Sequence, residues 1–113
     1  MGLKINDKWV WDFWTIRHQG IHHVYFLQAD KSLGDPNKRH WHVSVGHATT
    51  TDFKNYEVQG TALRPSVEGP IEAFDSFTTW TGSVIEHQGV FYMFYTGTKR
   101  SEGGVKQRIG LAR

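Results

Sequence analysis

The sequence predicts an all-β protein, and more specifically a partial β-propeller of about two blades. The chain of 113 residues is 14% aromatic and contains 12 glycines, a composition typical of strands joined by tight turns. No stretch has the sustained apolar period of an amphipathic helix. The third observation is an internal repeat, because His18-Gln19-Gly20 recurs 69 residues later as His87-Gln88-Gly89. Repeated antiparallel four-stranded units of about 40–50 residues are typical of propeller blades.

The repeat extends beyond this tripeptide. The same spacing relates Trp11 to Trp80, and a second block, Val45–Ala48, corresponds to Ile109–Ala112 at a spacing five residues shorter. The difference falls in a loop region that contains Gly, Lys and Asp, where changes of length are tolerated. A generic β-sandwich with hairpins that look alike by chance is the alternative, but two matching blocks in the same order favour blades.

The first repeat contains four expected strands. Its opening hairpin turns at Gln19-Gly20, where glycine supplies the positive φ that a two-residue turn needs. The polar segment Ser32–Arg39, which contains Gly34-Asp35-Pro36, is expected to be a loop. The strands of this first blade, residues 9–66, are expected at Trp9–Arg17, Ile21–Ala29, Trp41–Thr49 and Tyr56–Leu63.

The second repeat contains three expected strands and no residues for a fourth. They span Trp80–Glu86, Val90–Gly97 and Gln107–Ala112, and the first hairpin turns at Gln88-Gly89. We therefore predict a single domain, residues 1–113. It is composed of an N-terminal segment (1–8), a first blade (9–66) and a second blade (75–113) that lacks its outer strand.

Composition and charge exclude several classes of function. The chain has no cysteine, which rules out a disulfide framework, a thiolate zinc site and a cysteine nucleophile. A scattered net charge of +2 predicts no nucleic-acid partner, and the Lys38-Arg39 pair is expected to be solvated. The longest apolar run, Val90–Tyr95, is too short to span a membrane, and the first twenty residues contain no apolar segment of the kind that predicts a secretion signal. We therefore expect no membrane partner and a cytoplasmic location.

Seven histidines raise the question of a metal site. His40 and His42 share a face of the expected third strand, whereas His22 and His23 point to opposite faces of their strand. No cysteine joins them, and no helix with two histidines four residues apart is present. Solvated or core histidines explain the sequence better, so we expect neither a metal nor another cofactor.

Asp12 is the residue whose position indicates chemistry. A carboxylate inside an aromatic strand is costly unless it is paired or used, and the repeat relates Asp12 to Thr81. Equivalent positions on the innermost strands of a propeller face the same axis, so both side chains should lie together between Trp11 and Trp80. A carboxylate, a hydroxyl and two indole faces are suited to a sugar ring. The alternative is that both tryptophans are core residues and Asp12 caps a strand end.

Two motifs carry a resemblance to a known group of enzymes. Val10-Trp11-Asp12-Phe13-Trp14 and Trp80-Thr81-Gly82-Ser83, followed by Phe94-Tyr95-Thr96, resemble the first two blades of the five-bladed propeller glycosidases. That clan comprises glycoside hydrolase families 32, 43 and 68 and includes invertases, levansucrases and arabinanases. The likeness is greatest to the levansucrase family and covers nearly the whole chain.

The resemblance implies roles for individual residues. Asp12 matches the catalytic nucleophile, and Thr81 replaces a serine that hydrogen-bonds this nucleophile. The substrate-binding residues expected on this basis are Trp11, Trp80, Thr81, Ser83 and Trp14. The family also uses an Arg-Asp-Pro motif and a general-acid glutamate on later blades, and neither motif occurs here; Asp75 and Glu86 have no family motif around them.

These observations predict a glycosidase-like half-propeller that binds carbohydrate but lacks the full catalytic set and is not active alone. One alternative is an enzyme whose catalytic set is completed by oligomerisation or by a longer chain. It would be either a retaining glycoside hydrolase or a fructosyltransferase, which is a kind of transglycosylase. Another is a structural or interaction module with a vestigial pocket. We also expect a homo-oligomer, because Gln107–Ala112 leaves an unpaired sheet edge and Leu3–Asn6 belongs to neither repeat.

Overall fold

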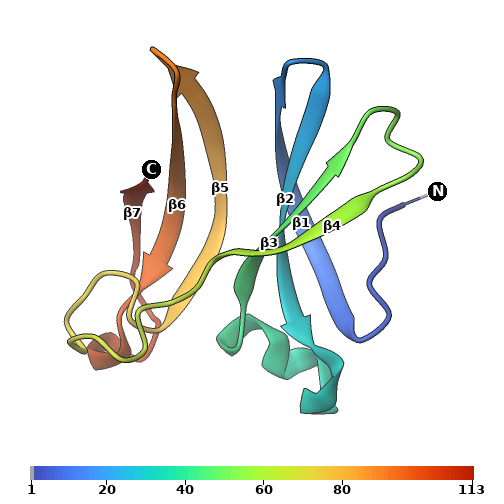
Figure 1. Cartoon of the computed structure of the whole chain (residues 1–113). Coiled ribbons are helices and arrows are strands. Elements are labelled where there is room, and N and C mark those ends of the chain that lie inside the picture. The colour runs from blue at the N-terminus through green and yellow to red at the C-terminus, as the bar shows by residue number, and fades with distance from the viewer. Residues whose placement is uncertain (1) are drawn as a thin grey trace.

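The computed structural model describes residues 2–113 and shows seven strands in two antiparallel sheets (Figure 1). The first sheet has the order β1-β2-β3-β4, and the second has the order β5-β6-β7. The strands are β1 (Lys8–His18), β2 (Ile21–Asp30), β3 (Ser44–Thr50), β4 (Glu57–Leu63), β5 (Thr78–His87), β6 (Val90–Thr98) and β7 (Gln107–Ala112). The predicted fold class is therefore confirmed: both sheets are meanders, and the second has one strand fewer.

The two sheets open with the same hairpin. In the β1–β2 turn Gln19 has φ 52° and Gly20 has φ 80°, and in the β5–β6 turn Gln88 has φ 52° and Gly89 has φ 78°. Two successive positive φ values give the turn a twist that matches the flanking strands. Both turns lie where the sequence predicts them.

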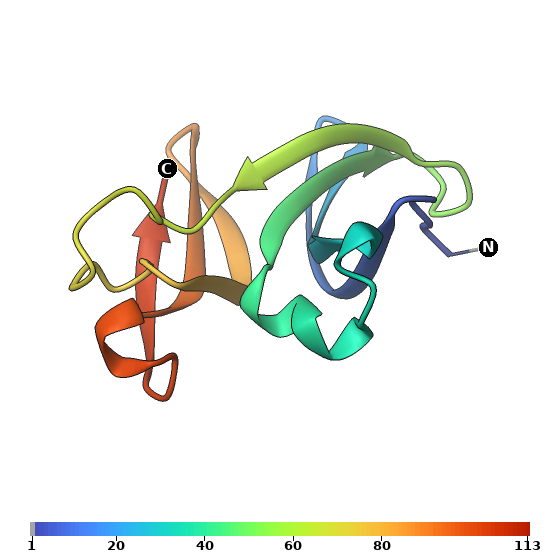
Figure 2. The same ribbon diagram turned by 90° about the horizontal axis from the view of Figure 1, so that it is seen from below.

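The main apolar core lies between the two sheets. The sheets lie side by side, and the segment 64–77 crosses from β4 to β5 (Figure 2). The core consists of side chains from both sheets and from the residue just before β3: Trp14, Leu27, Val43, Val45 and Met93. Burial of these side chains holds the sheets in a fixed relation, which in turn positions residues at the ends of β1 and β5.

Both innermost strands carry a β-bulge at equivalent positions. The pairing of β1 with β2 shifts between Trp11 and Phe13, and the pairing of β5 with β6 shifts between Trp80 and Gly82. The bulges leave Asp12 and Thr81 without a partner opposite them. A bulge re-aims the side chain of the extra residue away from the pleat, so the same backbone feature presents both side chains.

Short 3₁₀ helices replace part of the expected third strand. The segments η1 (Lys31–Leu33) and η2 (Pro36–Trp41) precede β3, and η3 (Arg100–Glu102) precedes β7. The expectation that the third strand begins at Trp41 and presents two histidines on one face is wrong. Pro36 occupies the first turn of η2, and the Asp35 carboxylate accepts a hydrogen bond from the Asn37 backbone N–H at 2.9 Å, which starts a helix.

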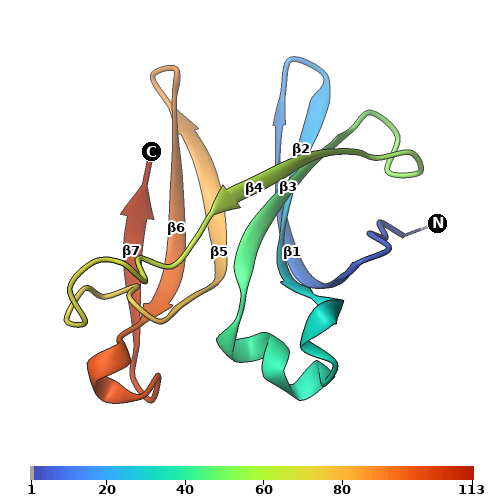
Figure 3. The same ribbon diagram turned by 60° about the horizontal axis from the view of Figure 1, so that its bottom comes forward.

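All three 3₁₀ helices lie at one end of the molecule, and the two hairpin turns lie at the opposite end (Figure 3). On the outer face of the first sheet, Leu3 and Ile5 pack against a second cluster formed by Val24, Phe26 and Ala48. The N-terminal segment thus covers its own sheet. Within residues 2–113 we find no helix with the length and apolarity needed to cross a bilayer.

Candidate functional site

A pocket of about 570 Å³ lies between the two sheets at the end that carries the helices. Four of the residues expected at the site line it: Trp11, Asp12, Trp80 and Thr81. Residues 39–41 of η2 form another part of the wall, together with Gln107 at the start of β7. The pocket therefore combines both innermost strands with the connection between β2 and β3 and with the start of β7.

Asp12 and Thr81 meet across the two sheets. The Thr81 hydroxyl donates a hydrogen bond to Oδ2 of Asp12 at 2.9 Å. Asp12 is exposed and has φ 41°, a backbone conformation that costs a non-glycine residue roughly 1–3 kcal/mol. The bulge and the hydroxyl together orient the carboxylate at the edge of the pocket.

Both indole rings are held in place by η2. The Trp80 Nε1–H donates to the backbone carbonyl of His40 at 3.0 Å, and its ring lies 5.8 Å from that of Trp41. The His40 ring packs edge-on against Trp11 at 5.9 Å, and the Arg39 guanidinium lies over the same indole at 5.3 Å. The pocket walls are thus aromatic, and their orientation is fixed by packing and by one hydrogen bond.

Trp14 and Ser83 are not brought into this pocket. Trp14 is only 8% exposed and belongs to the core between the sheets. Ser83 is exposed and lies opposite Phe94 in the second sheet. The two residues occupy equivalent positions two residues beyond their bulges, and the structure uses neither at the pocket.

Arg39 and His40 are the pocket residues that sequence reasoning missed. Arg39 is half-buried rather than solvated, and its Nη1 donates to the Pro36 carbonyl at 2.8 Å. The sequence signal that could have found them is Asp35-Pro36, a typical helix start within the segment that we expected to be a loop. The helix that begins there brings Arg39 and His40 to Trp11. Within the described chain, residues 2–113, no group of three or more His, Cys, Asp or Glu side chains could hold a metal ion.

The other carboxylates considered for catalysis lie elsewhere. Asp75 is buried and accepts a hydrogen bond from the Tyr95 hydroxyl at 2.7 Å. Burial, followed by the contact with Asp75, raises the pKa of Tyr95. Glu86 pairs with His18 at 3.0 Å near the hairpin turns, at the far end of the sheets. Of the carboxylates in residues 2–113, Asp12 alone lines the pocket.

Comparison with known families identifies the group to which this geometry belongs. Residues 8–112 match the model of the "Glycosyl hydrolases family 32 N-terminal domain". The chain belongs to glycosyl hydrolase family 32. The clan inferred from the two tryptophan motifs is thereby confirmed, and family 32 is the member of that clan that matches.

Two curated relatives illustrate the extent of the similarity. The chain is 32% identical over 93 residues to the sucrose-6-phosphate hydrolase of Bacillus subtilis, which covers 82% of this chain and 17% of that protein. It is 34% identical over 94 residues to an insoluble β-fructofuranosidase isoenzyme of Arabidopsis thaliana, covering 81% and 15%. The chain thus spans about a sixth of the length of these relatives.

Solved structures show the same fold. A family 117 glycoside hydrolase of Zobellia galactanivorans superposes with a TM-score of 0.73 at 14% identity, covering 97% of this chain and 37% of that one. An inulosucrase of Halalkalicoccus jeotgali, bound to kestose, superposes with a TM-score of 0.69 at 22% identity, covering 95% and 27%. The arrangement of both sheets is therefore that of part of a propeller glycosidase.

Proposed function

We propose that the pocket binds a carbohydrate, with Asp12 facing the anomeric carbon and Trp11 and Trp80 contacting the sugar ring. The observation that carries this proposal is the hydrogen bond between Thr81 and Asp12, made by the bulged residues of two equivalent strands. It joins an acceptor and a donor between two indoles, an arrangement that fits the hydroxyl-rich edge and apolar face of a sugar.

A fructosyl unit is the sugar we propose for the pocket. The family and two kinds of relative support it: one relative is named as a sucrose-6-phosphate hydrolase and another as a β-fructofuranosidase. In a retaining reaction the carboxylate attacks the anomeric carbon while a second carboxylic acid, about 5–5.5 Å away, protonates the departing oxygen. Asp12 supplies the first of these groups.

We further propose that this chain alone binds the sugar without appreciable turnover. A positioned general acid contributes about 10²–10⁴-fold to such a reaction, and Asp12 is the one carboxylate lining the pocket within residues 2–113. The second candidate function is a complete retaining glycoside hydrolase or fructosyltransferase, to which further residues contribute the acid. The observation in its favour is that the curated relatives are about five times as long as this chain.

Binding can be tested through the intrinsic fluorescence of Trp11 and Trp80, or by calorimetry, with sucrose and kestose as ligands. Asp12→Ala should abolish saturable binding, and Thr81→Val should weaken it several-fold. Asp7→Ala, which removes an exposed carboxylate outside the pocket, serves as the matched control and should bind as the parent does. Equal affinity in the Asp12 and Asp7 variants would contradict the proposed pocket.

Turnover separates the two candidate functions. Release of reducing sugar from sucrose is expected to be undetectable for the chain alone, and unchanged by Asp12→Asn. Hydrolysis that disappears in Asp12→Asn would instead favour the complete enzyme, because it would require a general acid within the assembled protein.

A further inference from the structure

An apolar pocket of about 280 Å³ lies on the outer face of the first sheet, the face turned away from the second sheet. Its floor includes Val24 and Phe26 of β2, which are 5% and 1% exposed. The N-terminal segment and the β3–β4 loop lie on the same side of the sheet (Figure 1). They contribute Leu3, Phe53 and Tyr56 to the walls, so the pocket is a hollow between the sheet and two covering segments rather than a flat patch.

The lining of this apolar pocket is aromatic and almost uncharged. Of the described residues that line it, Asp12 alone carries a formal charge. The Tyr56 hydroxyl donates to the Phe53 carbonyl at 3.1 Å and is therefore already paired. The aromatic lining residues are Trp11, Phe13, Phe26, Phe53 and Tyr56. A sugar ring placed here would bury hydroxyls with few partners, which costs free energy, whereas an aromatic ring would gain edge-to-face contacts with these walls.

The volume of the apolar pocket suits a single aromatic ring with a short linker. A cavity of about 150 Å³ lined by apolar side chains is enough to bind benzene, and this pocket is nearly twice that size. Its rim is open to solvent, because the side chains of Phe13 and Phe53 are 71% and 43% exposed. A ring can therefore enter from the surface while the chain of atoms that carries it remains outside the floor.

The apolar pocket adjoins the pocket that holds Asp12 and Thr81, called here the sugar pocket. Trp11 and Asp12 line both, whereas Thr81 lines the sugar pocket alone. Asp12 is the extra residue of the β1 bulge, and the side chains on either side of it, Trp11 and Phe13, belong to the two faces of the sheet. A ligand seated at Asp12 in the sugar pocket can therefore extend past this residue into the apolar pocket.

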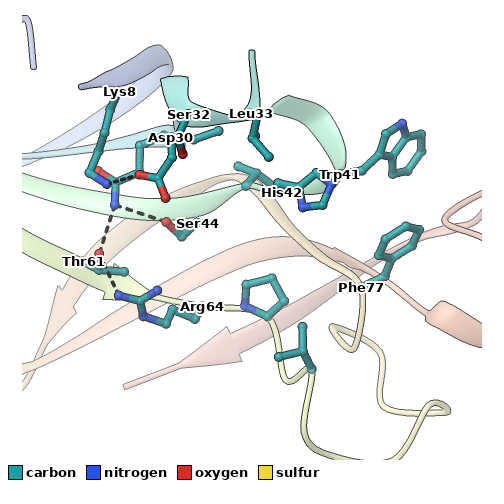
Figure 4. A pocket seen from close by; sticks show the side chains of 15 residues that line it. Lys8, Asp30, Ser32, Leu33, Trp41, His42, Ser44, Thr61, Arg64 and Phe77 are labelled. Carbon is teal, nitrogen blue, oxygen red and sulfur yellow. Dashed lines mark hydrogen bonds and ion pairs between the residues drawn. The ribbon is translucent and has the colours of Figure 1, made fainter. Parts of the chain in front are cut away.

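The larger pocket in Figure 4, of about 450 Å³, does not offer this continuation. Neither Trp11 nor Asp12 lines it. Its polar groups are engaged with one another, since Lys8 pairs with Asp30 at 2.6 Å and the buried Gln28 amide donates to Ser44 Oγ at 3.1 Å. The apolar pocket is thus the one that extends the site from Asp12.

We propose that the apolar pocket binds an aromatic group carried by the sugar, so that the ligand is a carbohydrate esterified with an aromatic acid. The inference rests on the proposed function, because it takes the sugar to be bound with its anomeric carbon facing Asp12. A nucleophile displaces a leaving group from the opposite side of the carbon that it attacks. The aromatic group beside Asp12 is therefore attached through a ring hydroxyl and not through the anomeric oxygen.

Calorimetric titration of the chain with sucrose, its monobenzoates on the fructosyl unit and the matching monoacetates tests the inference. At least one monobenzoate is expected to bind about tenfold or more tightly than sucrose, because burial of an aromatic ring contributes on this scale. The matching acetate, which has the ester but no ring, should bind as sucrose does. Phe53→Ala should lower the preference for the benzoate several-fold. The matched control is Phe94→Ala, which removes a similarly exposed phenylalanine from the second sheet and should preserve the preference.

Two results would overturn the inference. The first is that no benzoate binds more tightly than its acetate, or that Phe53→Ala and Phe94→Ala lower the preference equally. The second is a fall in the mass measured by light scattering in Phe53→Ala but not in Phe94→Ala. That fall would mean that the apolar pocket receives a side chain from a second copy of the chain instead of a ring carried by the sugar.

Benzyl alcohol, which carries the ring without the sugar, separates this inference from the proposed function. NMR titration should show that it binds to the parent and to Asp12→Ala, which no longer binds sucrose, and that Phe53→Ala weakens this binding. If sucrose binds to the parent but no benzoate is preferred, the inference fails and the proposed function stands. If benzyl alcohol binds in a Phe53-dependent way but sucrose does not bind to the parent, the proposed function fails, and with it the assignment of the ring to a sugar.

Discussion

The two sheets use the same backbone but place different chemistry on it. Each begins with the same two-residue turn and carries a bulge at the equivalent position of its innermost strand. In the first sheet the bulged residue is Asp12, and in the second it is Thr81, which donates a hydrogen bond to it. The repeat therefore supplies the geometry, and a single difference at one position supplies a complementary acceptor and donor.

The sheets also differ in how their outer faces are covered. The N-terminal segment packs Leu3 and Ile5 on the first sheet, whereas the second sheet exposes Phe94, Ile109 and Leu111. Of these three side chains Ile109 is the most exposed, at 79%. The first repeat thus has two packed faces, and the second repeat has one.

The largest effect on stability is expected at Trp14 and Ser83, which occupy equivalent positions in the repeat but are packed differently. Trp14→Ala removes a large core side chain and should destabilise the fold by about 3–5 kcal/mol. Ser83→Ala, at the equivalent exposed position, should change stability by about 0.5 kcal/mol or less. Urea denaturation measures both. Loss of sugar affinity in folded Ser83→Ala would contradict the placement of this residue outside the pocket.

The next effect concerns the residue after each bulge. A methyl group on Gly82 would lie 2.0 Å from the Phe94 carbonyl oxygen, so Gly82→Ala must distort the β5–β6 pairing. We expect a loss of about 3 kcal/mol or more in the free energy of unfolding. Phe13, the equivalent residue of the first sheet, is 71% exposed, so Phe13→Ala should cost about 1 kcal/mol or less. Equal melting temperatures for the two variants would contradict the close approach at Gly82.

Much of this comparison could be predicted from sequence, and the exceptions have physical causes. The turns were predictable because Gln-Gly recurs between apolar runs, and the pairing of Asp12 with Thr81 followed from the repeat. The bulges that direct the Asp12 and Thr81 side chains could not be predicted, because strand register depends on long-range hydrogen bonds rather than on local sequence pattern. Trp41 ends a helix instead of opening a strand, because the Asp35 cap and Pro36 start a helix that runs through Trp41.

The site shows the same division between local and long-range causes. Trp14 and Ser83 share motifs with the pocket residues, yet the direction in which each side chain points places them in a core and on an open face. Arg39 looks like a solvated loop charge in sequence, and only the folding of η2 against β1 brings it over Trp11. Motif membership therefore predicted the neighbourhood of the site, and tertiary packing decided which residues enter it.

The exposed outer face of the second sheet predicts self-association, which the first sheet does not need. We expect light scattering at high concentration to give a mass above the 13.0 kDa of one chain. Ile109→Lys places a charge at the centre of the exposed face and should return the mass to that of a monomer. Ile21→Lys, at an exposed position of the first sheet, is the control and should leave the mass unchanged. A monomer in the parent chain would contradict the prediction.

A smaller effect is expected for the contact that joins the two bulges. Asp12→Ala, Thr81→Val and the double variant form a cycle that measures the coupling between the carboxylate and the hydroxyl. Because both groups are exposed, the coupling in the free energy of unfolding should be about 0.5–1.5 kcal/mol. A coupling near zero would mean that the hydrogen bond does not help to hold the sheets together, and that the shared core alone fixes the pocket.

The smallest effect that we expect is a difference between the two sheets in how acid changes their contribution to stability. The first sheet contains His47, which stacks on Tyr25 and lies 3.0 Å from His23 between ring nitrogens, and the second sheet has Leu111 at the matching position. Burial, and then the neighbouring His23, lower the pKa of His47 below its ordinary value. The folded chain therefore binds fewer protons than the unfolded chain just below about pH 6.5, the ordinary histidine value.

Stability should accordingly be full above about pH 6.5 and should decline as the pH falls below it. His47→Leu gives the first sheet the residue of the second and removes this titration. We expect the urea midpoint to fall less between about pH 7.5 and about pH 5.5 in this variant than in the parent. His87→Leu, which replaces an exposed histidine at the β5–β6 turn, is the control and should keep the parent's dependence on pH. Parallel pH profiles for the parent and His47→Leu would place the acid sensitivity outside the first sheet's histidine pair.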